Sequence, residues 1–333
     1  MKDFLKKIKP REPKVLFSVM ILLTASVIWG LAFSAQKDAG ELGGFTVGAA
    51  RNLFAVLFLL PIIPLMDRLT KNGRKMIIRL EEVEGDKKPH LKWLPDFTRP
   101  ELIGGCIAGF FMTFATALQQ NGIGSGTDAG KAGFITALYV VIVPVYALFF
   151  GKKSPPRVWI SVGIAVFGFY LLSVKSDFTI VPTDLMILLC AFVFGGQIMA
   201  IDLFAPKCDG VRLSFIQFLS AFLLNTACTL IFESPIRFDL IGEHILSLLF
   251  LGVFSSGIAY TLQVLGQRNL NPGVASILLS LESVFGAIGG AIIFDERMSD
   301  REILGSAVVF GAVILSQIEF TKKCKNEKKD ENL

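Results

Sequence analysis

A single carboxylate, Glu282, lies near the middle of an apolar stretch that runs from Pro272 to Asp295. The stretch is long enough to cross a lipid bilayer as a helix. A carboxylate at bilayer depth is energetically costly, so we expect it to face a helix-bundle interior or a wet cavity and to have a partner. Glu282 is therefore predicted either to serve a solute pathway or to fasten one helix to another through hydrogen bonds.

Other polar or amphipathic side chains deep in apolar stretches are candidates for the same pathway. They are Trp29, Arg51, Lys131, Tyr139, Gln197, Gln217, Tyr260 and Gln263. Trp29 lies well inside its stretch, away from the interfacial depth typical of Trp, so it is predicted to line a cavity or to pack in the core. Arg51 and Lys131 lie near the predicted helix ends, from which long cationic chains can also extend to the interface. The depth of Arg51 makes it a feasible partner for Glu282.

The composition indicates a membrane environment for these stretches. Of the 333 residues, 53% are hydrophobic and 18% are charged, and the mean hydropathy is +0.60. A soluble core cannot absorb this much apolar surface. We predict an all-α integral membrane protein with ten transmembrane helices. The predicted spans cover about residues 15–36, 45–66, 101–119, 128–150, 158–174, 183–204, 213–232, 245–266, 273–294 and 303–318.

The distribution of Lys and Arg predicts the orientation of these spans. With the N-terminus inside, 26 basic residues fall in the tails and cytoplasmic loops and five fall in the outer loops. This bias places both termini in the cytoplasm, and short loops suit a cell (plasma) membrane. Residues 1–14 are predicted to form a basic tail, residues 67–99 a cytoplasmic interfacial loop, and residues 319–333 a charged, disordered tail.

Several chemistries find no support in the residue types. The five cysteines are odd in number and imply no disulfide framework. His90 and His244 are far apart and lack nearby ligands at metal-binding spacing, so we expect no metal site and no cofactor. The segment GSGTDAGKA at 124–132 only half-mimics a nucleotide-binding loop and has no strand before it. We also expect no nucleic-acid partner.

An internal repeat divides the chain into two halves. IWGLAFSA resembles VFGGQIMA at an offset of 165, LQQNGI resembles LGQRNL at 147, and Leu138-Tyr139 resembles Leu281-Glu282 at 143. The offset falls where the first half carries longer loops. Residues 15–174 and 183–318 are thus predicted to be two five-helix repeats. Because five is odd, the second repeat should be inverted relative to the first, and Tyr139 and Glu282 should approach each other from opposite halves.

Three segments resemble the EamA-type transporters of the drug/metabolite transporter superfamily. They are WGLAFSAQK in the first span, ARNLFAVLFLLPIIP in the second, and SLESVFGAIGGAIIFDERMSDREILGSAVVFGAVIL at the end. The resemblance covers nearly the whole chain and implies a ten-helix, two-repeat carrier of small organic solutes, similar to bacterial amino-acid and metabolite exporters. Two positions depart from the family pattern: Ser283 stands where the family often has Pro, and Lys153 takes the place in the first repeat that Glu296 holds in the second.

We therefore expect a secondary transporter, and by resemblance an exporter, of a small polar or zwitterionic metabolite such as an amino acid. Its partners would be the substrate, the lipid bilayer and protons as a coupling ion, because burial disfavours the ionised form of a carboxyl group such as Glu282. One alternative is a carrier of anionic esters, such as sugar phosphates or nucleotide sugars, with Arg51 and Lys131 as charge partners. An integral-membrane enzyme would need acidic metal-binding clusters or a nucleophile with its base, and the sequence shows neither. A scaffold or receptor is a further alternative, and a structure whose two halves enclose no cavity would indicate it.

Overall fold

The structure is a computed structural model that describes residues 13–69, 97–127, 129–173, 182–293 and 299–318. The described elements are helices joined by turns, with no strand among them. Eight helices are long and apolar enough to cross a membrane, and Pro156–Leu172 forms a shorter apolar helix. Nearly all of the predicted tail 1–14, most of the predicted loop 67–99 and the tail 319–333 lie outside the described residues.

The first half contains five helical segments, and the fourth is interrupted. The elements are α2 (Pro13–Asp38), η1 (Ala39–Glu41), α3 (Gly44–Leu69), α4 (Arg99–Gly124), α5 (Ala129–Ala137), α6 (Tyr139–Phe149) and α7 (Pro156–Ser173). The predicted span 128–150 corresponds to α5 and α6 together, because the helix breaks at Leu138.

The second half repeats this order and contains two irregular segments. The elements are α8 (Pro182–Phe204), η2 (Ala205–Lys207), α9 (Gly210–Phe232), α10 (Phe238–Glu243), α11 (Ile245–Leu249), η3 (Phe250–Tyr260), α12 (Thr261–Gln267), α13 (Pro272–Leu279), α14 (Glu282–Ile293) and α15 (Asp300–Gln317). The predicted span 245–266 corresponds to α11, η3 and α12, of which η3 is a π-helix. The span 273–294 corresponds to α13 and α14, which are separated by a break at 280–281. Each predicted span thus has a helical counterpart.

Local sequence sets where several helices begin. Asp209 caps α9 by accepting hydrogen bonds from the backbone N–H groups of Val211 and Arg212, and Asn271 caps α13 by accepting one from Gly273. Ser299 and Glu302 form a capping box at the start of α15. These side chains accept bonds from backbone donors that have no partner within the first helical turn. Elsewhere, helix formation satisfies the backbone internally, as a bilayer requires.

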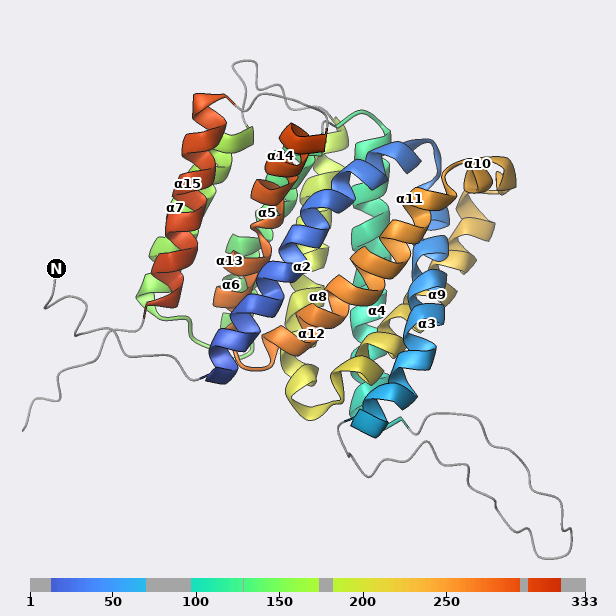
Figure 1. The fold of residues 1–333 in the computed structure, drawn as a ribbon, viewed down its shortest axis with the longest axis horizontal. Coiled ribbons are helices and arrows are strands. Elements are labelled where there is room, and N and C mark those ends of the chain that lie inside the picture. Colours follow the sequence, from blue (N-terminus) through green and yellow to red (C-terminus); the bar gives the residue numbers. More distant parts are fainter. Residues whose placement is uncertain (1–12, 70–96, 128, 174–181, 294–298, 319–333) are drawn as a thin grey trace, which may run out of the picture.

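The two halves pack against each other with the symmetry of an inverted repeat. The second helices α3 and α9 form one pair, and the fifth helices α7 and α15 form another. The contact of α4 with α8 corresponds to the contact of α2 with η3 and α12, and the contact of α8 with α5 and α6 corresponds to that of α2 with α13 and α14. In Figure 1, α2 runs upward whereas α8 runs downward. The predicted all-α fold with two inverted five-helix repeats is confirmed.

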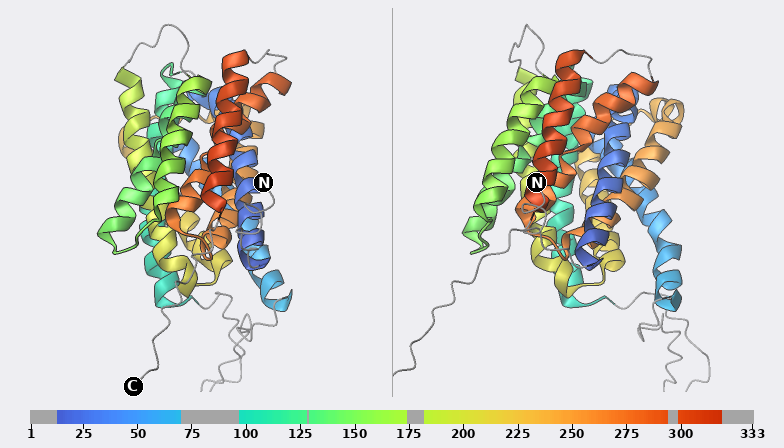
Figure 2. Two further views of the ribbon diagram at one scale, coloured as in Figure 1. Left: turned by 90° about the vertical axis from the view of Figure 1, so that its left-hand side faces the viewer. Right: turned by 60° about the vertical axis from the view of Figure 1, so that its left-hand side comes forward.

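The α7–α15 pair flanks the rest of the bundle and lies together in all views (Figures 1 and 2). Its axes approach closely at Gly168 and Gly305, where a Cβ on Gly305 would lie 2.7 Å from the Gly168 carbonyl oxygen. Only a residue without a side chain allows this backbone approach, as in other small-residue contacts between membrane helices.

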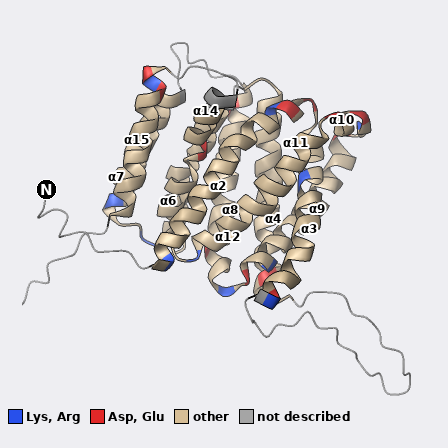
Figure 3. Ribbon diagram, viewed as in Figure 1, with Lys and Arg blue, Asp and Glu red and all other residues tan. Residues whose placement is uncertain are grey.

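Charged residues collect at the two ends of the bundle, and the ribbon between them is almost entirely uncharged (Figure 3). We call the end at which α2 begins and α15 ends the lower end, as drawn in Figure 1, and the opposite end the upper end. This distribution is expected for helices that span a hydrocarbon layer, because ionised side chains are tolerated at depth only where the protein surrounds them.

Candidate functional site

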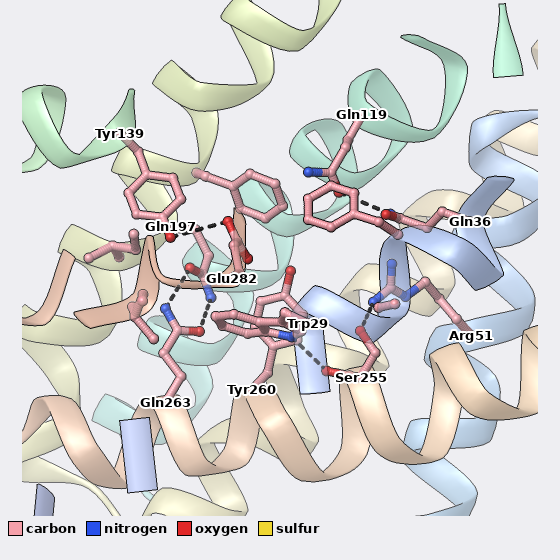
Figure 4. Close-up of a pocket in the computed structure, with 15 residues that line it drawn as sticks. Trp29, Gln36, Arg51, Gln119, Tyr139, Gln197, Ser255, Tyr260, Gln263 and Glu282 are labelled. Atoms are coloured by element: carbon pink, nitrogen blue, oxygen red, sulfur yellow. Dashed lines mark hydrogen bonds between the residues drawn. The ribbon is translucent and has the colours of Figure 1, made fainter. Parts of the chain in front are cut away.

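A cavity lies in the interior between the two repeats (Figure 4). Seven of the nine residues predicted from the sequence line it: Trp29, Arg51, Tyr139, Gln197, Tyr260, Gln263 and Glu282. The lining also includes Ala32, Phe33, Gln36, Gln119, Phe194, Ile198, Ser255 and Leu279. Gln217 lies just behind the lining, because its side-chain oxygen is 3.5 Å from Gln197 Nε2. Lys131 lies elsewhere and is described below.

Tyr139 and Glu282 meet at one side of the cavity. The Tyr139 hydroxyl donates a hydrogen bond of 3.2 Å to Glu282 Oε1, and both side chains are buried. Each is the first residue of the helix that follows a break, α6 for Tyr139 and α14 for Glu282. The shift of 143 residues that relates them in sequence therefore corresponds to direct contact between the two repeats.

The break before Glu282 forms without a proline. The backbone N–H groups of Leu281 and Ser283 bond to carbonyl groups three residues earlier, which tightens the chain at that point. The Ser283 hydroxyl donates to the Gly133 carbonyl of α5 at 2.7 Å. Ser283, at the position where the resembling family often has Pro, thus ties one interrupted helix to the other.

Arg51 lies on α3 and points into the protein, with only 3% of the residue exposed. Its Nε donates to Ser256 Oγ and its Nη2 donates to Ser255 Oγ, both at 3.0 Å. No carboxylate of a described residue forms an ion pair with it. Two neutral hydroxyl groups therefore hold this buried cation, and it does not extend to the interface.

Arg51 and Glu282 occupy different sides of the cavity and have different partners. In Figure 4, Trp29 and Tyr260 lie between the two labelled side chains. The direct Arg51–Glu282 contact considered from the sequence is not made in this structure. That expectation compared only depth along the helix axes, and the two side chains are separated sideways across the bundle.

The middle of the cavity has an aromatic wall. The rings of Trp29 and Tyr260 have centroids 4.5 Å apart and are tilted by 58°, and Phe218 packs behind Tyr260. Trp29 Nε1 donates to the Ser255 carbonyl at 3.0 Å. Trp29 is thus both a wall of the cavity and part of the packed core, which combines the two alternatives predicted from the sequence.

Amide groups bound the cavity at two places. Gln197 and Gln263 exchange reciprocal hydrogen bonds of 3.3 and 3.1 Å. At the other place, Gln36 Nε2 donates to Gln119 Oε1 at 2.9 Å, and Gln119 Nε2 donates to Thr136 Oγ1 at 3.1 Å. Sequence reasoning did not select Gln36 and Gln119, because it treated them as the last residues of their spans. Their Gln-rich surroundings, AQK and LQQN, are the signal that could have indicated them.

Comparisons with known proteins decide the family. The model of the EamA-like transporter family matches residues 16–174 and 181–317. The chain belongs to the EamA-like transporter family. An uncharacterized transporter from Archaeoglobus fulgidus is 28% identical to this EamA-like transporter over 309 residues, which cover 91% of this chain and 86% of the relative. A crystal structure described only as that of a protein is similar in fold, with a TM-score of 0.68 and 16% identity over 90% of this chain and 96% of the other.

The EamA-like transporter is therefore a multi-pass integral membrane protein with a transport function. The two matched segments coincide with the two structural repeats, α2–α7 and α8–α15. The resemblance drawn from the sequence is confirmed. The matches are to transporters, which agrees with the expectation that the protein acts as a carrier and not as an enzyme.

In this EamA-like transporter Lys131 does not line the cavity. Its ammonium group lies 2.5 Å from Asp184 Oδ2 at the start of α8. A second ion pair lies near the lower end, where Lys152, just after the end of α6, has its Nζ 2.5 Å from Asp202 Oδ2 of α8. The interrupted segment α5–α6 is thus bound to α8 through one ion pair near each end.

Proposed function

We propose that this EamA-like transporter is a secondary transporter that exports small zwitterionic metabolites such as amino acids. The observation that carries the proposal is the placement of Arg51 and Glu282. A buried cation and a buried carboxylate line one cavity, on different sides of an aromatic wall, and they are not paired with each other. Two unlike charges held apart in a low-dielectric interior are suited to a ligand that carries both opposite charges.

Each part of the cavity has a role in this proposal. Arg51 would bind the substrate carboxylate, Glu282 would bind its ammonium group, and the Trp29 and Tyr260 rings would contact the apolar part. An aromatic face also attracts a nearby cation. The charged and amide groups are set among apolar and aromatic side chains, as is typical of small-molecule sites.

The position of Lys131 weighs against anionic esters as substrates. A phosphate or nucleotide-sugar carrier is expected to bring several cations to its ligand. Among the described lining residues Arg51 is the cation, and Lys131 is bound to Asp184 outside the lining. The presence of Glu282 in the same cavity adds repulsion for an anion.

Transport would proceed by alternating access between the two inverted repeats. The Tyr139–Glu282 contact lies where two interrupted helices meet, and interrupted helices at the repeat interface are typical of secondary-transporter sites. Glu282 would ionise when it faces water and take up a proton when it is occluded, so that protons are coupled to the solute. On the charge bias of the loops, we place the lower end and both termini in the cytoplasm of a cell (plasma) membrane.

The test is exchange and pH-driven uptake of the common L-amino acids in proteoliposomes. Wild-type protein should exchange at least one zwitterion and should not exchange sugar phosphates. Arg51→Lys should impair exchange nearly as much as Arg51→Ala, because a lysine cannot reproduce the bidentate geometry of the guanidinium group. Full activity of Arg51→Lys would contradict a role in carboxylate binding.

Glu282→Gln tests proton coupling separately. The substitution keeps the shape and hydrogen-bonding capacity of the side chain but cannot ionise. Because the amide oxygen can still accept a hydrogen bond from the substrate ammonium group but carries no charge, we expect counterflow exchange to persist with a raised KM, while accumulation driven by a pH gradient is lost. If the variant keeps the wild-type pH dependence, Glu282 is a structural fastener and not the coupling group.

A further inference from the structure

The partners of Arg51 are unusual for a buried cation, and they come from one irregular segment. Ser255 and Ser256 are adjacent residues of the π-helix η3. Both hydroxyl groups are neutral acceptors, so neither brings a negative charge to Arg51. A guanidinium group has five N–H donors. The two serine bonds engage Nε and Nη2, and Nη1 makes no hydrogen bond to a described residue. Part of the guanidinium group is therefore left to bind a ligand, and no ion pair with a described residue offsets its positive charge.

The π-helix geometry favours the contact of two consecutive serines with one guanidinium group. In an α-helix, consecutive residues diverge by about 100° around the axis and do not share a face. A π-helix bonds i to i+5, so its turn is wider and consecutive side chains diverge slightly less. In η3 the hydroxyl groups of Ser255 and Ser256 both reach Arg51 on α3, at Nη2 and Nε, two nitrogens of the same guanidinium group.

Two glycines of η3 bring its backbone close to α3. A Cβ on Gly252 would lie 2.4 Å from Phe54 Cβ and 3.0 Å from the Arg51 carbonyl oxygen. A Cβ on Gly257 would lie 2.7 Å from Phe58 Cδ1. These glycines flank the serine pair along η3, so the helices approach on both sides of the Arg51 contact. The short side chain of serine can then span the remaining gap to the guanidinium group.

The serine pair is fixed from the cavity side as well. Trp29 Nε1 donates to the Ser255 carbonyl, so the backbone of η3 is held by α2 while its hydroxyl groups hold α3. Three elements thus determine the position of one charged group. A group that is held rigidly before the ligand binds loses less entropy on binding.

We propose that Ser255 and Ser256 are positioning residues, which hold the Arg51 guanidinium for a substrate carboxylate and so make η3 a determinant of carboxylate selectivity. This inference rests on the proposed zwitterion transport and extends it to residues that do not themselves bind the carboxylate. Neutral hydroxyl partners orient the cation without neutralising it. A carboxylate in the place of either serine would orient it equally well but would compete with the substrate.

The test compares each common L-amino acid with its carboxyl-reduced amino alcohol in proteoliposome exchange. The amino alcohol keeps the ammonium group and the side chain but lacks the group that Arg51 would bind. The variants are then assayed with the amino acid that wild-type protein exchanges best and with the amino alcohol derived from it. Ser255→Ala and Ser256→Ala should raise KM for the amino acid about tenfold, the effect of a lost hydrogen bond to a charged group, with the maximal rate nearly unchanged. KM for the amino alcohol should change less than twofold.

Three controls separate positioning from a general structural effect. Ser255→Thr and Ser256→Thr retain a hydroxyl group and should recover most of the affinity for the amino acid. Ser214→Ala removes a buried hydroxyl that donates to the Gly210 carbonyl within α9 and should alter neither KM. If the alanine variants raise both KM values equally, or leave both unchanged, the positioning role is wrong. If wild-type protein exchanges no amino acid, the proposed function fails and the inference fails with it.

Discussion

The Tyr139 hydroxyl of the first repeat lies 3.2 Å from the Glu282 carboxylate of the second, and each residue begins the helix that follows a break. Both breaks lie at the repeat interface, and the Ser283 hydroxyl joins α14 to α5 next to them. A movement of one repeat against the other would therefore act directly on this contact. The pair links the proposed binding group to the elements that are expected to move.

Tyr139→Phe removes the hydroxyl group but keeps the ring that packs against the core. We expect amino acid exchange to fall about fivefold to tenfold, which corresponds to the loss of one hydrogen bond to a carboxylate. The measurement is counterflow in proteoliposomes at matched protein content. Tyr146→Phe is the matched control, because Tyr146 lies on the same helix and its hydroxyl makes no hydrogen bond to a described residue. Equal effects of the two substitutions would assign Tyr139 a packing role only.

Arg212→Ala should strongly destabilise the protein. Arg212 and Asp67 form two hydrogen bonds of 2.8 and 2.7 Å between α9 and α3, and their side chains are only 3% and 9% exposed. Removing one partner leaves an uncompensated buried charge, which typically costs about 3–5 kcal/mol. We expect a clear fall in Tm of the detergent-solubilised protein, and Arg212→Lys should recover only part of it because the bidentate geometry is lost.

The Arg237–Asp239 pair provides the comparison. Its closest distance is also 2.7 Å, but its side chains are 61% and 63% exposed. Each residue favours the charged form of the other, because the hydrogen bond between them raises the pKa of Arg237 and lowers the pKa of Asp239. Solvent screens such exposed pairs, so Arg237→Ala should leave Tm unchanged. A comparable loss of Tm at both sites would show that burial does not determine the effect.

The sequence predicts the features that follow from a pattern along the chain, such as an apolar run or a repeated segment. The apolar runs predicted the spans, and the 143-residue shift predicted that Tyr139 and Glu282 approach each other. The pattern does not encode sideways separation between helices. For this reason depth alone suggested a contact between Arg51 and Glu282, whereas Arg51 bonds to Ser255 and Ser256.

Other features depend on local geometry that hydropathy does not report. The π-helix η3 has the composition of an ordinary apolar span, and its serines look like small packing residues until Arg51 is placed beside them. Helix α14 begins after a break without the proline that commonly marks one. Gln36 and Gln119 fell at predicted span boundaries, where an error of a few residues decides whether a polar side chain faces solvent or a cavity.

Gly30→Ala should disturb the contact between α2 and α14. A Cβ at this position would lie 2.6 Å from the Gly286 nitrogen and 2.7 Å from the Phe285 carbonyl carbon, which are backbone atoms that cannot rotate away. Overpacking of this kind typically costs about 1–3 kcal/mol, and we expect a lower Tm together with reduced exchange, because the preceding residue, Trp29, lines the cavity. Gly163→Ala is the control, since a Cβ there would meet no atom within 4 Å. An unchanged Tm for Gly30→Ala would contradict the close helix crossing.

The last prediction concerns the orientation of the bundle in the membrane. Ser125 follows α4, Asp239 lies in α10 and Ser299 precedes α15, all near the upper end, whereas Ser154 precedes α7 at the lower end. In a background without native cysteines, Ser125→Cys, Asp239→Cys and Ser299→Cys should react with a membrane-impermeant maleimide added to intact cells. Ser154→Cys should react only after the cells are opened. The reason is the concentration of Lys and Arg in the tails and in the loops of the lower end, which favours their retention in the cytoplasm.

The opposite labelling at all four sites would reverse the orientation but keep the fold. Reversal at a single site would contradict the two inverted five-helix repeats, because it would require one helix fewer or one more between neighbouring reporters.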